Sequence, residues 1–257
     1  MHDKSMSTAC VVLLALVASP AGVAGPTIDP GRPSIVLVHG ALTDGSSWRG
    51  VYEQLSKDGF AVWVVQQPLT GLADDVAATE RVLSQVSGPV VLVGHSYGGT
   101  VITVAGVNPK VKALVYVAAL QPDVGETTNQ ISASRPGKVP ASDLIVTRDG
   151  YLLFQPSRFP ADVGADVPVA NARFLAQSQM PVAAAAFDTP IQAAAWHDKP
   201  SFGVIATDDL ELSSELSHWM YNRSGTTITE IRGSHLVHVS QPRAVAKVIE
   251  VAARSIH

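Results

Sequence analysis

Cysteine and charge are both scarce in this chain. Cys10 is the only cysteine among 257 residues, so no disulfide can form within the chain and no set of thiolates exists to hold a metal. Charged residues make up 16 % of the chain, and the formal net charge is −4. This composition argues against a nucleic-acid-binding surface, and the lack of a basic run argues against attachment to an anionic membrane.

A short apolar run near the N-terminus has the features of a secretory signal peptide. Residues 10–18 carry no charge, Lys4 precedes them, and small residues including Gly22 and Ala24 follow. The run is too short to span a bilayer, and its small-x-small end is typical of a cleavage site. We therefore expect a signal peptide over residues 1–24, a secreted or periplasmic protein, and no stable membrane anchor. The alternative is an N-terminal helix that packs on the domain.

Residues 25–257 are expected to form a single α/β domain. Short apolar runs alternate with longer amphipathic segments, and continuous apolar strands separated by helices are typical of a parallel sheet covered on both faces. The pattern predicts a mostly parallel six-stranded sheet. Strands are expected at residues 35–38, 61–65, 90–93, 113–117, 202–206 and 227–231, and helices at 47–57, 72–86, 97–106, 212–223 and 241–255.

The alternation of strands and helices stops between residues 121 and 199. A structureless loop of that length is rare in a compact domain, so we interpret this segment as an inserted lid. Within it, residues 167–176 and the alanine-rich 182–187 are expected to be helical. Residues 151–154 are expected to form a short strand after a turn.

The strongest functional signal is Gly-His-Ser-Tyr-Gly at residues 94–98, directly after the apolar run 89–93. It matches the G-x-S-x-G nucleophile elbow, a strand-turn-helix unit that presents one serine hydroxyl. The glycines leave room for the main chain that approaches the strained serine. Ser96 is therefore the candidate nucleophile. The alternative is a glycine-rich turn that carries a solvated serine.

A serine nucleophile needs a base to remove its proton, and the base must be oriented by a third group. In an open α/β sheet such groups come from loops at the carboxyl ends of the strands. His235 follows the predicted strand 227–231 and is the candidate base, with His238 as its rival three residues later.

The acid that orients the base is expected after strand 202–206, where Asp208 and Asp209 are adjacent. Either carboxylate fits, and the pair could equally cap the following helix. Asp123 is the fallback position. The chain order of serine, acid and histidine is the one known for an elbow of this kind.

The developing oxyanion needs two backbone N–H donors. One is expected from Tyr97, the residue after the nucleophile. The other is expected from Ala41, because Gly40 permits a tight turn after the first strand. Losing one such donor typically costs about 3 kcal/mol of transition-state stabilisation.

Three motifs together resemble the α/β-hydrolase superfamily: residues 36–41 with Trp48, residues 94–99, and residues 233–235 followed by 240–242. The resemblance runs from about residue 35 to the end of the chain. Within the superfamily, the sequence is most similar to the small single-lid branch of plant methylesterases, hydroxynitrile lyases and their bacterial relatives.

This resemblance implies which aspartate is the acid and which reaction is catalysed. Asp209, rather than Asp208, matches the acid of the family. Family lyases carry a lysine directly after the catalytic histidine, but this chain has Leu236 there. The resemblance therefore implies hydrolysis rather than cyanohydrin cleavage. Epoxide hydrolases and dehalogenases of this fold need an aspartate where Ser96 stands.

We expect a serine hydrolase that cleaves small carboxylic esters through an acyl-enzyme, without cofactor or metal. The alternatives are hydrolysis of another acyl substrate, such as a lactone or an amide, and a ligand-binding protein on the same scaffold with slow turnover. Large lid side chains are candidates for an apolar substrate pocket, and packing within the lid core is the competing role for each. These are Tyr151, Phe154, Phe159, Met180, Phe187 and Trp196.

Overall fold

The computed structural model of the chain describes residues 31–256. The predicted signal peptide lies outside the described residues. Within them, the main sheet has six strands in the order β2-β1-β3-β4-β8-β9, and every neighbouring pair is parallel. The predicted α/β sheet is confirmed. Its strands are β1 (Ser34–Val38), β2 (Val62–Val65), β3 (Val90–Ser96), β4 (Val111–Ala119), β8 (Ser201–Ala206) and β9 (Thr227–Ile231).

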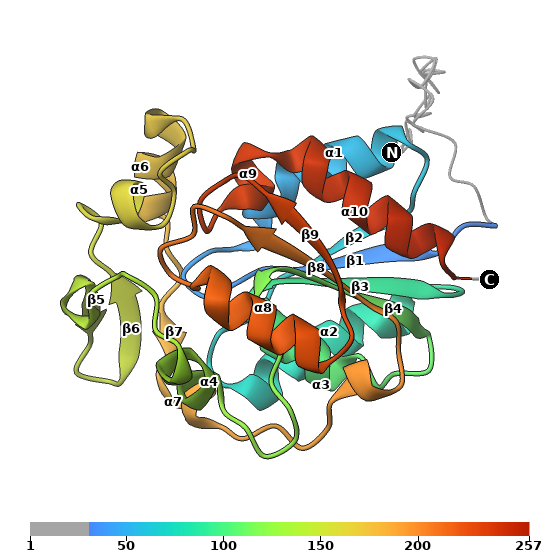
Figure 1. Ribbon diagram of the computed structural model, residues 1–257, viewed down its shortest axis with the longest axis horizontal. Coiled ribbons are helices and arrows are strands. Elements are labelled where there is room, and N and C mark those ends of the chain that lie inside the picture. Colours follow the sequence, from blue (N-terminus) through green and yellow to red (C-terminus); the bar gives the residue numbers. More distant parts are fainter. Residues whose placement is uncertain (1–30, 257) are drawn as a thin grey trace, which may run out of the picture.

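Helices cover both faces of this sheet (Figure 1). One face carries α1 (Arg49–Lys57), the short α9 (Val237–Ser240) and α10 (Pro242–Arg254). The other face carries α2 (Leu72–Gln85), α3 (Gly98–Ala105) and α8 (Ser214–Arg223). The central strands are mostly apolar because both faces are buried. None of the helices in residues 31–256 is long and apolar enough to cross a membrane.

Two helices, α1 and α8, begin two residues later than the sequence pattern predicted, and a side-chain cap lies at the 3₁₀ turn ahead of α1 and at the start of α8. The Asp44 carboxylate accepts from the Ser46 amide and starts a 3₁₀ turn, Gly45–Trp48, ahead of α1. The Ser213 hydroxyl accepts from the Leu216 amide, so α8 begins at Ser214. Such caps supply acceptors for amides that have no partner within the helix.

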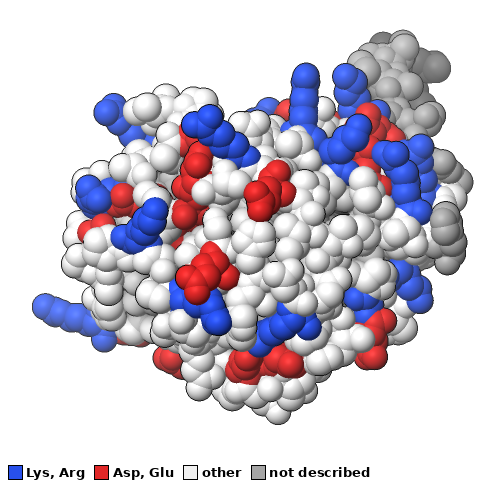
Figure 2. Space-filling model, in the orientation of Figure 1, with Lys and Arg blue, Asp and Glu red and all other residues white. Residues whose placement is uncertain are grey.

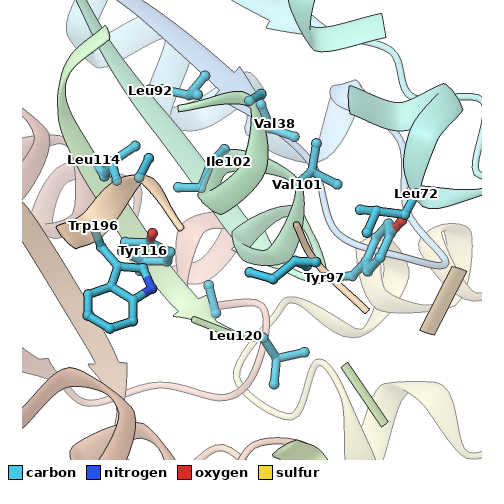
Figure 3. Packing of buried hydrophobic residues seen from close by; sticks show 14 of the residues in the cluster. Val38, Leu72, Leu92, Tyr97, Val101, Ile102, Leu114, Tyr116, Leu120 and Trp196 are labelled. Atoms are coloured by element: carbon cyan, nitrogen blue, oxygen red, sulfur yellow. The ribbon is translucent and has the colours of Figure 1, made fainter. Parts of the chain in front are cut away.

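Aromatic side chains anchor the core on the α3 face of the sheet. Figure 3 shows Tyr97, Tyr116 and Trp196 among aliphatic residues of β3, β4 and α3. The Tyr116 hydroxyl lies 3.0 Å from the Thr103 hydroxyl, and the Trp196 indole N–H donates to the Pro122 carbonyl at 2.8 Å. Each buried polar tip therefore has a hydrogen-bond partner, as burial requires.

Between β4 and β8 the chain forms a second, smaller structure at one end of the main sheet (Figure 1). A three-stranded antiparallel sheet, β5-β6-β7, is its centre, and a separate apolar cluster packs beneath its helices. We call this segment, residues 121–199, the lid. Its elements are α4 (Thr128–Ser134), β5 (Leu144–Val146), β6 (Tyr151–Phe154), α5 (Phe159–Asp162), α6 (Val169–Gln177), β7 (Val182–Ala183) and α7 (Ala185–Asp188), with 3₁₀ turns at Ala141–Asp143 and Ala195–His197.

The two ends of the lid lie together. The Gly125 amide donates to the Ile191 carbonyl at 2.9 Å, and the Ile191 amide donates to the Glu126 carbonyl at 3.0 Å. The bond from Trp196 to Pro122 joins the same two segments. The lid therefore leaves the main sheet and returns to it through one short paired region.

The structure corrects one prediction inside the lid. The helix expected over residues 182–187 is wrong in its first half, because Val182 and Ala183 form β7 and pair with β6. The Ala183 amide also donates to the Leu69 carbonyl at 2.8 Å. Tertiary pairing overrides the helix propensity of alanine here. The predicted strand at 151–154 and helix near 167–176 are present as β6 and α6.

Charged side chains are interspersed on the surface. On the face that Figure 2 shows, basic and acidic groups alternate with wide uncharged areas, and neither sign forms a continuous patch. This distribution agrees with the low charge content of the sequence.

Candidate active site

The turn after β3 holds Ser96 in a strained conformation. Its φ is 51°, a left-handed value that side-chain-bearing residues rarely adopt. A Cβ on Gly94 would lie 2.5 Å from the Gly98 carbonyl oxygen, and a Cβ on Gly98 would lie 2.6 Å from the His39 carbonyl oxygen. Both flanking glycines are therefore required by the close approach of the main chain.

Replacing Gly94 by alanine is expected to lower the free energy of unfolding by about 2 kcal/mol or more, since the added methyl group meets backbone that cannot move aside cheaply. Thermal unfolding followed by circular dichroism measures the change. Gly71→Ala is the matched control: its Cβ would meet nothing closer than 3.8 Å, and we expect a loss below about 1 kcal/mol. Equal unfolding temperatures for the two variants would contradict the steric argument.

Ser96, His235 and Asp209 form a continuous chain of hydrogen bonds. His235 lies in the loop after β9, and its Nδ1 is 2.8 Å from Asp209 Oδ2 while its Nε2 is 2.8 Å from Ser96 Oγ. The side chains of His235 and Asp209 are 7 % and 2 % exposed. With the Nδ1 proton directed at the carboxylate, Nε2 is free to accept the hydroxyl proton of Ser96.

The second oxygen of Asp209 caps the turn that follows β8. Oδ1 accepts from the Glu211 amide at 2.8 Å and from the Leu212 amide at 3.0 Å. Capping and contact with the histidine are thus performed by one carboxylate, which holds its orientation from both sides. This fixes the plane of the imidazole relative to Ser96.

The competing carboxylates lie elsewhere. Asp208 is exposed and pairs with Arg232 at 3.3 Å. Asp123 pairs with the half-exposed His197 at 2.8 Å, at the base of the lid. Of the three aspartates singled out from the sequence, the structure brings only Asp209 against the histidine.

The rival histidine is buried behind the site. The His238 ring packs on Trp48 at 4.5 Å and on His95 at 4.1 Å between ring centroids. Burial lowers the pKa of His238 to about 3, so its ring is neutral. The distance from His95 Nε2 to the His235 carbonyl oxygen is 2.9 Å. This contact supports the backbone of His235, the histidine that contacts Ser96.

Charge in the site is governed by burial and by Asp209. Burial disfavours the protonated form of His235, but the adjacent Asp209 carboxylate outweighs it, so the pKa of His235 is raised above its ordinary value. For His39 and His95, burial is the largest influence and lowers the pKa. His235 is therefore the imidazole in this region that is tuned to hold a proton.

The loop after β1 approaches the nucleophile closely. A Cβ on Gly40 would lie 2.9 Å from the Cβ of Ser96, so only glycine permits this contact. His39 fixes the loop, with Nδ1 2.8 Å from the Gly40 carbonyl oxygen and Nε2 accepting from the Gln67 amide at 3.0 Å. In the described chain, neither the Ala41 amide nor the Tyr97 amide donates a hydrogen bond. Ala41 and Ser96 both line the same cavity.

The Tyr97 side chain is anchored by a residue that the sequence analysis missed. Its hydroxyl donates to Asp75 Oδ2 at 2.9 Å, and Asp75 Oδ1 accepts from the Leu69 amide at 2.8 Å. Burial raises the pKa of Asp75 to about 6. The sequence signal that could have identified Asp75 is its position on the apolar face of α2, at helical spacing from Leu72 and Thr79.

Ser96 and His235 open into a cavity of about 220 Å³ between the main sheet and the lid. Phe159 and Phe187 line it, as expected from the sequence. Most of its wall is apolar. The aliphatic residues that line it are Ala41, Leu42, Leu120, Leu144, Leu152, Val163, Val182, Leu212 and Leu236.

The other four aromatic or methionine candidates do not line this cavity. Phe154 packs edge-on against Phe159 in the lid core, and Trp196 is fixed in the main core by its bond to Pro122. Tyr151 precedes Leu152 on β6, and alternate residues of a strand face opposite sides, so Leu152 reaches the cavity instead. Met180 packs against the main core ahead of β7.

Within residues 31–256, no group of three or more histidine, cysteine, aspartate or glutamate side chains is arranged to hold a metal ion.

Comparisons with known proteins agree with this architecture. Residues 35–248 match the family model described as the alpha/beta hydrolase family. The chain is 28 % identical over 252 residues to an alpha/beta hydrolase, nvfD, of Aspergillus novofumigatus (strain IBT 16806), covering 86 % of this chain and 97 % of that protein. It is 34 % identical over 108 residues to a carbendazim hydrolyzing esterase of Nocardioides sp. (strain SG-4G), covering 37 % of this chain and 45 % of that protein.

A solved structure shows the same fold. A pyrethroid hydrolase from Sphingobium faniae JZ-2 has a TM-score of 0.73 and 21 % sequence identity, and the match covers 87 % of this chain and 98 % of that one.

Proposed function

The chain belongs to the alpha/beta hydrolase family, and from this premise we propose that it hydrolyses small carboxylic esters with Ser96 as the nucleophile. The observation that carries the proposal is the hydrogen-bond chain from Ser96 through His235 to Asp209 at the base of an apolar cavity. Relatives named as a hydrolase and as an esterase support the reaction type.

The reaction proceeds in two halves. Ser96 Oγ attacks the ester carbonyl carbon while His235 Nε2 takes its proton, and the Ala41 and Tyr97 amides hold the negative charge on the carbonyl oxygen. His235 then gives the proton to the departing alkoxide. The alcohol dissociates, and the acyl group remains bonded to Ser96 as an acyl-enzyme. Water attacks this acyl group with His235 as the base, and the carboxylic acid is released as Ser96 recovers its proton. Asp209 remains ionised and holds the imidazolium in place.

Leu236 favours hydrolysis over cyanohydrin cleavage. It occupies the position after the histidine, is fully buried, and lines the cavity beside the lid cluster. An apolar side chain offers no charge to stabilise a cyanide leaving group.

Burst kinetics with p-nitrophenyl acetate separate an esterase from a slow binding protein, because the esterase continues to release p-nitrophenol after the first equivalent.

In the pH profile of kcat/KM, the loss of activity on the acid side is expected at a higher pH than a free imidazole would give. His235 accepts a proton only when neutral, and its pKa is raised above the ordinary value of 6.5. Protonation therefore persists to higher pH than in a free imidazole, and kcat/KM for a neutral ester should fall as the pH drops through a value above 6.5. Initial rates across the acid and neutral range measure this limb. A midpoint below the ordinary value would contradict the role of Asp209 in charging His235.

A further inference from the structure

Glu211 is an acidic residue inside the cavity that the ester chemistry does not use. It lies two residues after Asp209, and its side chain lines the same cavity as Ser96 and His235. Its Oε1 is buried and has no hydrogen-bond partner in the described protein. Burial raises the pKa of Glu211 to about 7. Such an oxygen is costly to keep in a protein unless something occupies its lone pairs.

The lid holds the backbone that carries this carboxyl group. The Lys138 amide donates to the Leu210 carbonyl at 2.7 Å, and Pro136 forms an isolated bridge with Leu212. Between them, Gly137 lies so close to the Glu211 backbone carbonyl that a Cβ there would collide with it. The backbone on both sides of Glu211 is therefore fixed at the point where its side chain lines the cavity.

Glu211 stands where two cavities adjoin. A second space of about 350 Å³ extends toward α4 and β5, and it shares Glu211, Asn129, Ser132 and Leu144 with the cavity that contains Ser96. An ester bound at Ser96 can thus place a substituent beside Glu211. Ser132 and Asn129 also line this junction, and the Asn129 amide nitrogen donates to Asp188 at 2.7 Å.

Among the described residues that line the two cavities, none is lysine or arginine, so no such side chain in their walls neutralises this carboxylate. His235 favours the ionised form of Glu211, but Asp209 and Asp162 oppose it. A group that brings both a positive charge and an N–H donor would satisfy Oε1 and offset the carboxylate charge at once. A neutral hydroxyl would supply only the hydrogen bond.

We propose that Glu211 is a specificity-determining residue that binds an ammonium group of the ester substrate, so that the enzyme prefers esters carrying a protonated amine. This inference rests on the proposed function, because it places the amine on a substrate whose carbonyl lies at Ser96. The ammonium N–H donates to Oε1 at the junction of the two cavities, and the remaining carbon chain packs on the aliphatic wall.

Two pairs of esters test the preference, each pair differing only in a protonated nitrogen against a carbon. On the alcohol side, 2-(dimethylamino)ethyl acetate is compared with 3-methylbutyl acetate. On the acyl side, p-nitrophenyl dimethylglycinate is compared with p-nitrophenyl 3-methylbutanoate. For at least one pair we expect the wild type to favour the amine, and Glu211→Gln to reduce the ratio of the two kcat/KM values by about tenfold or more, as for loss of a charged hydrogen bond.

Glu215→Gln is the matched control. Glu215 lies four residues further along the chain, in the first turn of α8, is exposed, and pairs with Arg135. Its substitution removes the same charge, and the ratio should stay at the wild-type value. If the ratio of the two kcat/KM values drops equally in both variants, the effect is due to net charge and the proposal is overturned.

Binding to the Ser96→Ala protein separates this inference from the proposed function. Calorimetric titration of that variant with each acetate measures recognition without turnover. Tighter binding of the amine, lost when Glu211→Gln is added, supports the role of Glu211 even if no ester is hydrolysed by the wild type. Equal binding of the two acetates in the titration, together with no preference for the amine in either pair, overturns the role of Glu211, and hydrolysis of these esters leaves the ester chemistry standing.

Discussion

Replacing Ser96 by alanine is expected to abolish ester hydrolysis, with a loss in kcat on the order of a millionfold. The substitution removes the only hydroxyl that lies within hydrogen-bond distance of His235 Nε2 among the described side chains. Without it no acyl-enzyme can form, and the residual rate comes from binding and the oxyanion amides alone. Initial rates with p-nitrophenyl acetate and covalent labelling by a fluorophosphonate measure the loss.

The matched control is Ser84→Ala on the exposed face of α2, where the hydroxyl bonds only to its own helix and to a neighbouring glutamine. This variant should keep wild-type rate and labelling. Circular dichroism and thermal unfolding verify that both variants are folded. Fluorophosphonate labelling that persists in Ser96→Ala would place the nucleophile elsewhere in the chain.

Replacing Asp209 by asparagine is expected to lower kcat by about 10⁴-fold. The amide keeps the shape of the side chain but removes the negative charge 2.8 Å from His235 Nδ1. The imidazolium that forms during the attack of Ser96 then loses its counter-charge, and the tautomer with the proton on Nδ1 is no longer enforced. Steady-state kinetics on the purified variant measure the loss.

The adjacent Asp208 provides a control that differs by one position. Its side chain is 57 % exposed and contacts only the exposed Arg232. An ion pair of this kind contributes little to stability, and it has no connection to the imidazole. Asp208→Asn should therefore retain wild-type kcat. A collapse in rate with Asp208→Asn, while Asp209→Asn stays active, would reverse the assignment.

The sheet and the nucleophile turn could be predicted because their signals are local. Strands buried on both faces must be apolar throughout, so β1 and β3 are visible as continuous runs. The glycines around Ser96 reflect contacts within a few residues or with the neighbouring loop. In these places the chemistry of a short segment determines the structure.

The acid could not be chosen between Asp208 and Asp209 from local chemistry alone. Both follow β8, and a single step along the backbone turns one side chain toward His235 and the other toward solvent. Only the resemblance to a family distinguished them at that stage. The direction depends on the Asp209 cap, whose acceptor geometry is set by the following turn.

The cavity wall was the least predictable part. Large aromatic residues of the lid were chosen by size, yet the direction of each depends on pairing inside the lid. Tyr151 and Leu152 are neighbours on β6, and only Leu152 faces Ser96's cavity. A charged residue ahead of a helix is ordinary on a surface, so nothing in the local sequence singles out Glu211. Its place in the cavity wall depends on lid residues such as Asn129 and Gly137, more than seventy residues earlier in the chain.

The paired base of the lid makes this enzyme modular. The segment at Gly125 is hydrogen-bonded to Ile191, and Trp196 bonds to Pro122 beside it. The chain between these two segments is therefore inserted at a single point. Insertions, deletions and exchanges within such a segment need not disturb the strand order of the main sheet. Substrate range can therefore evolve, or be engineered by transplanting lids, as long as a new lid keeps the contacts that flank Asp209 and His235, such as Lys138 with Leu210 and Val163 with Leu236.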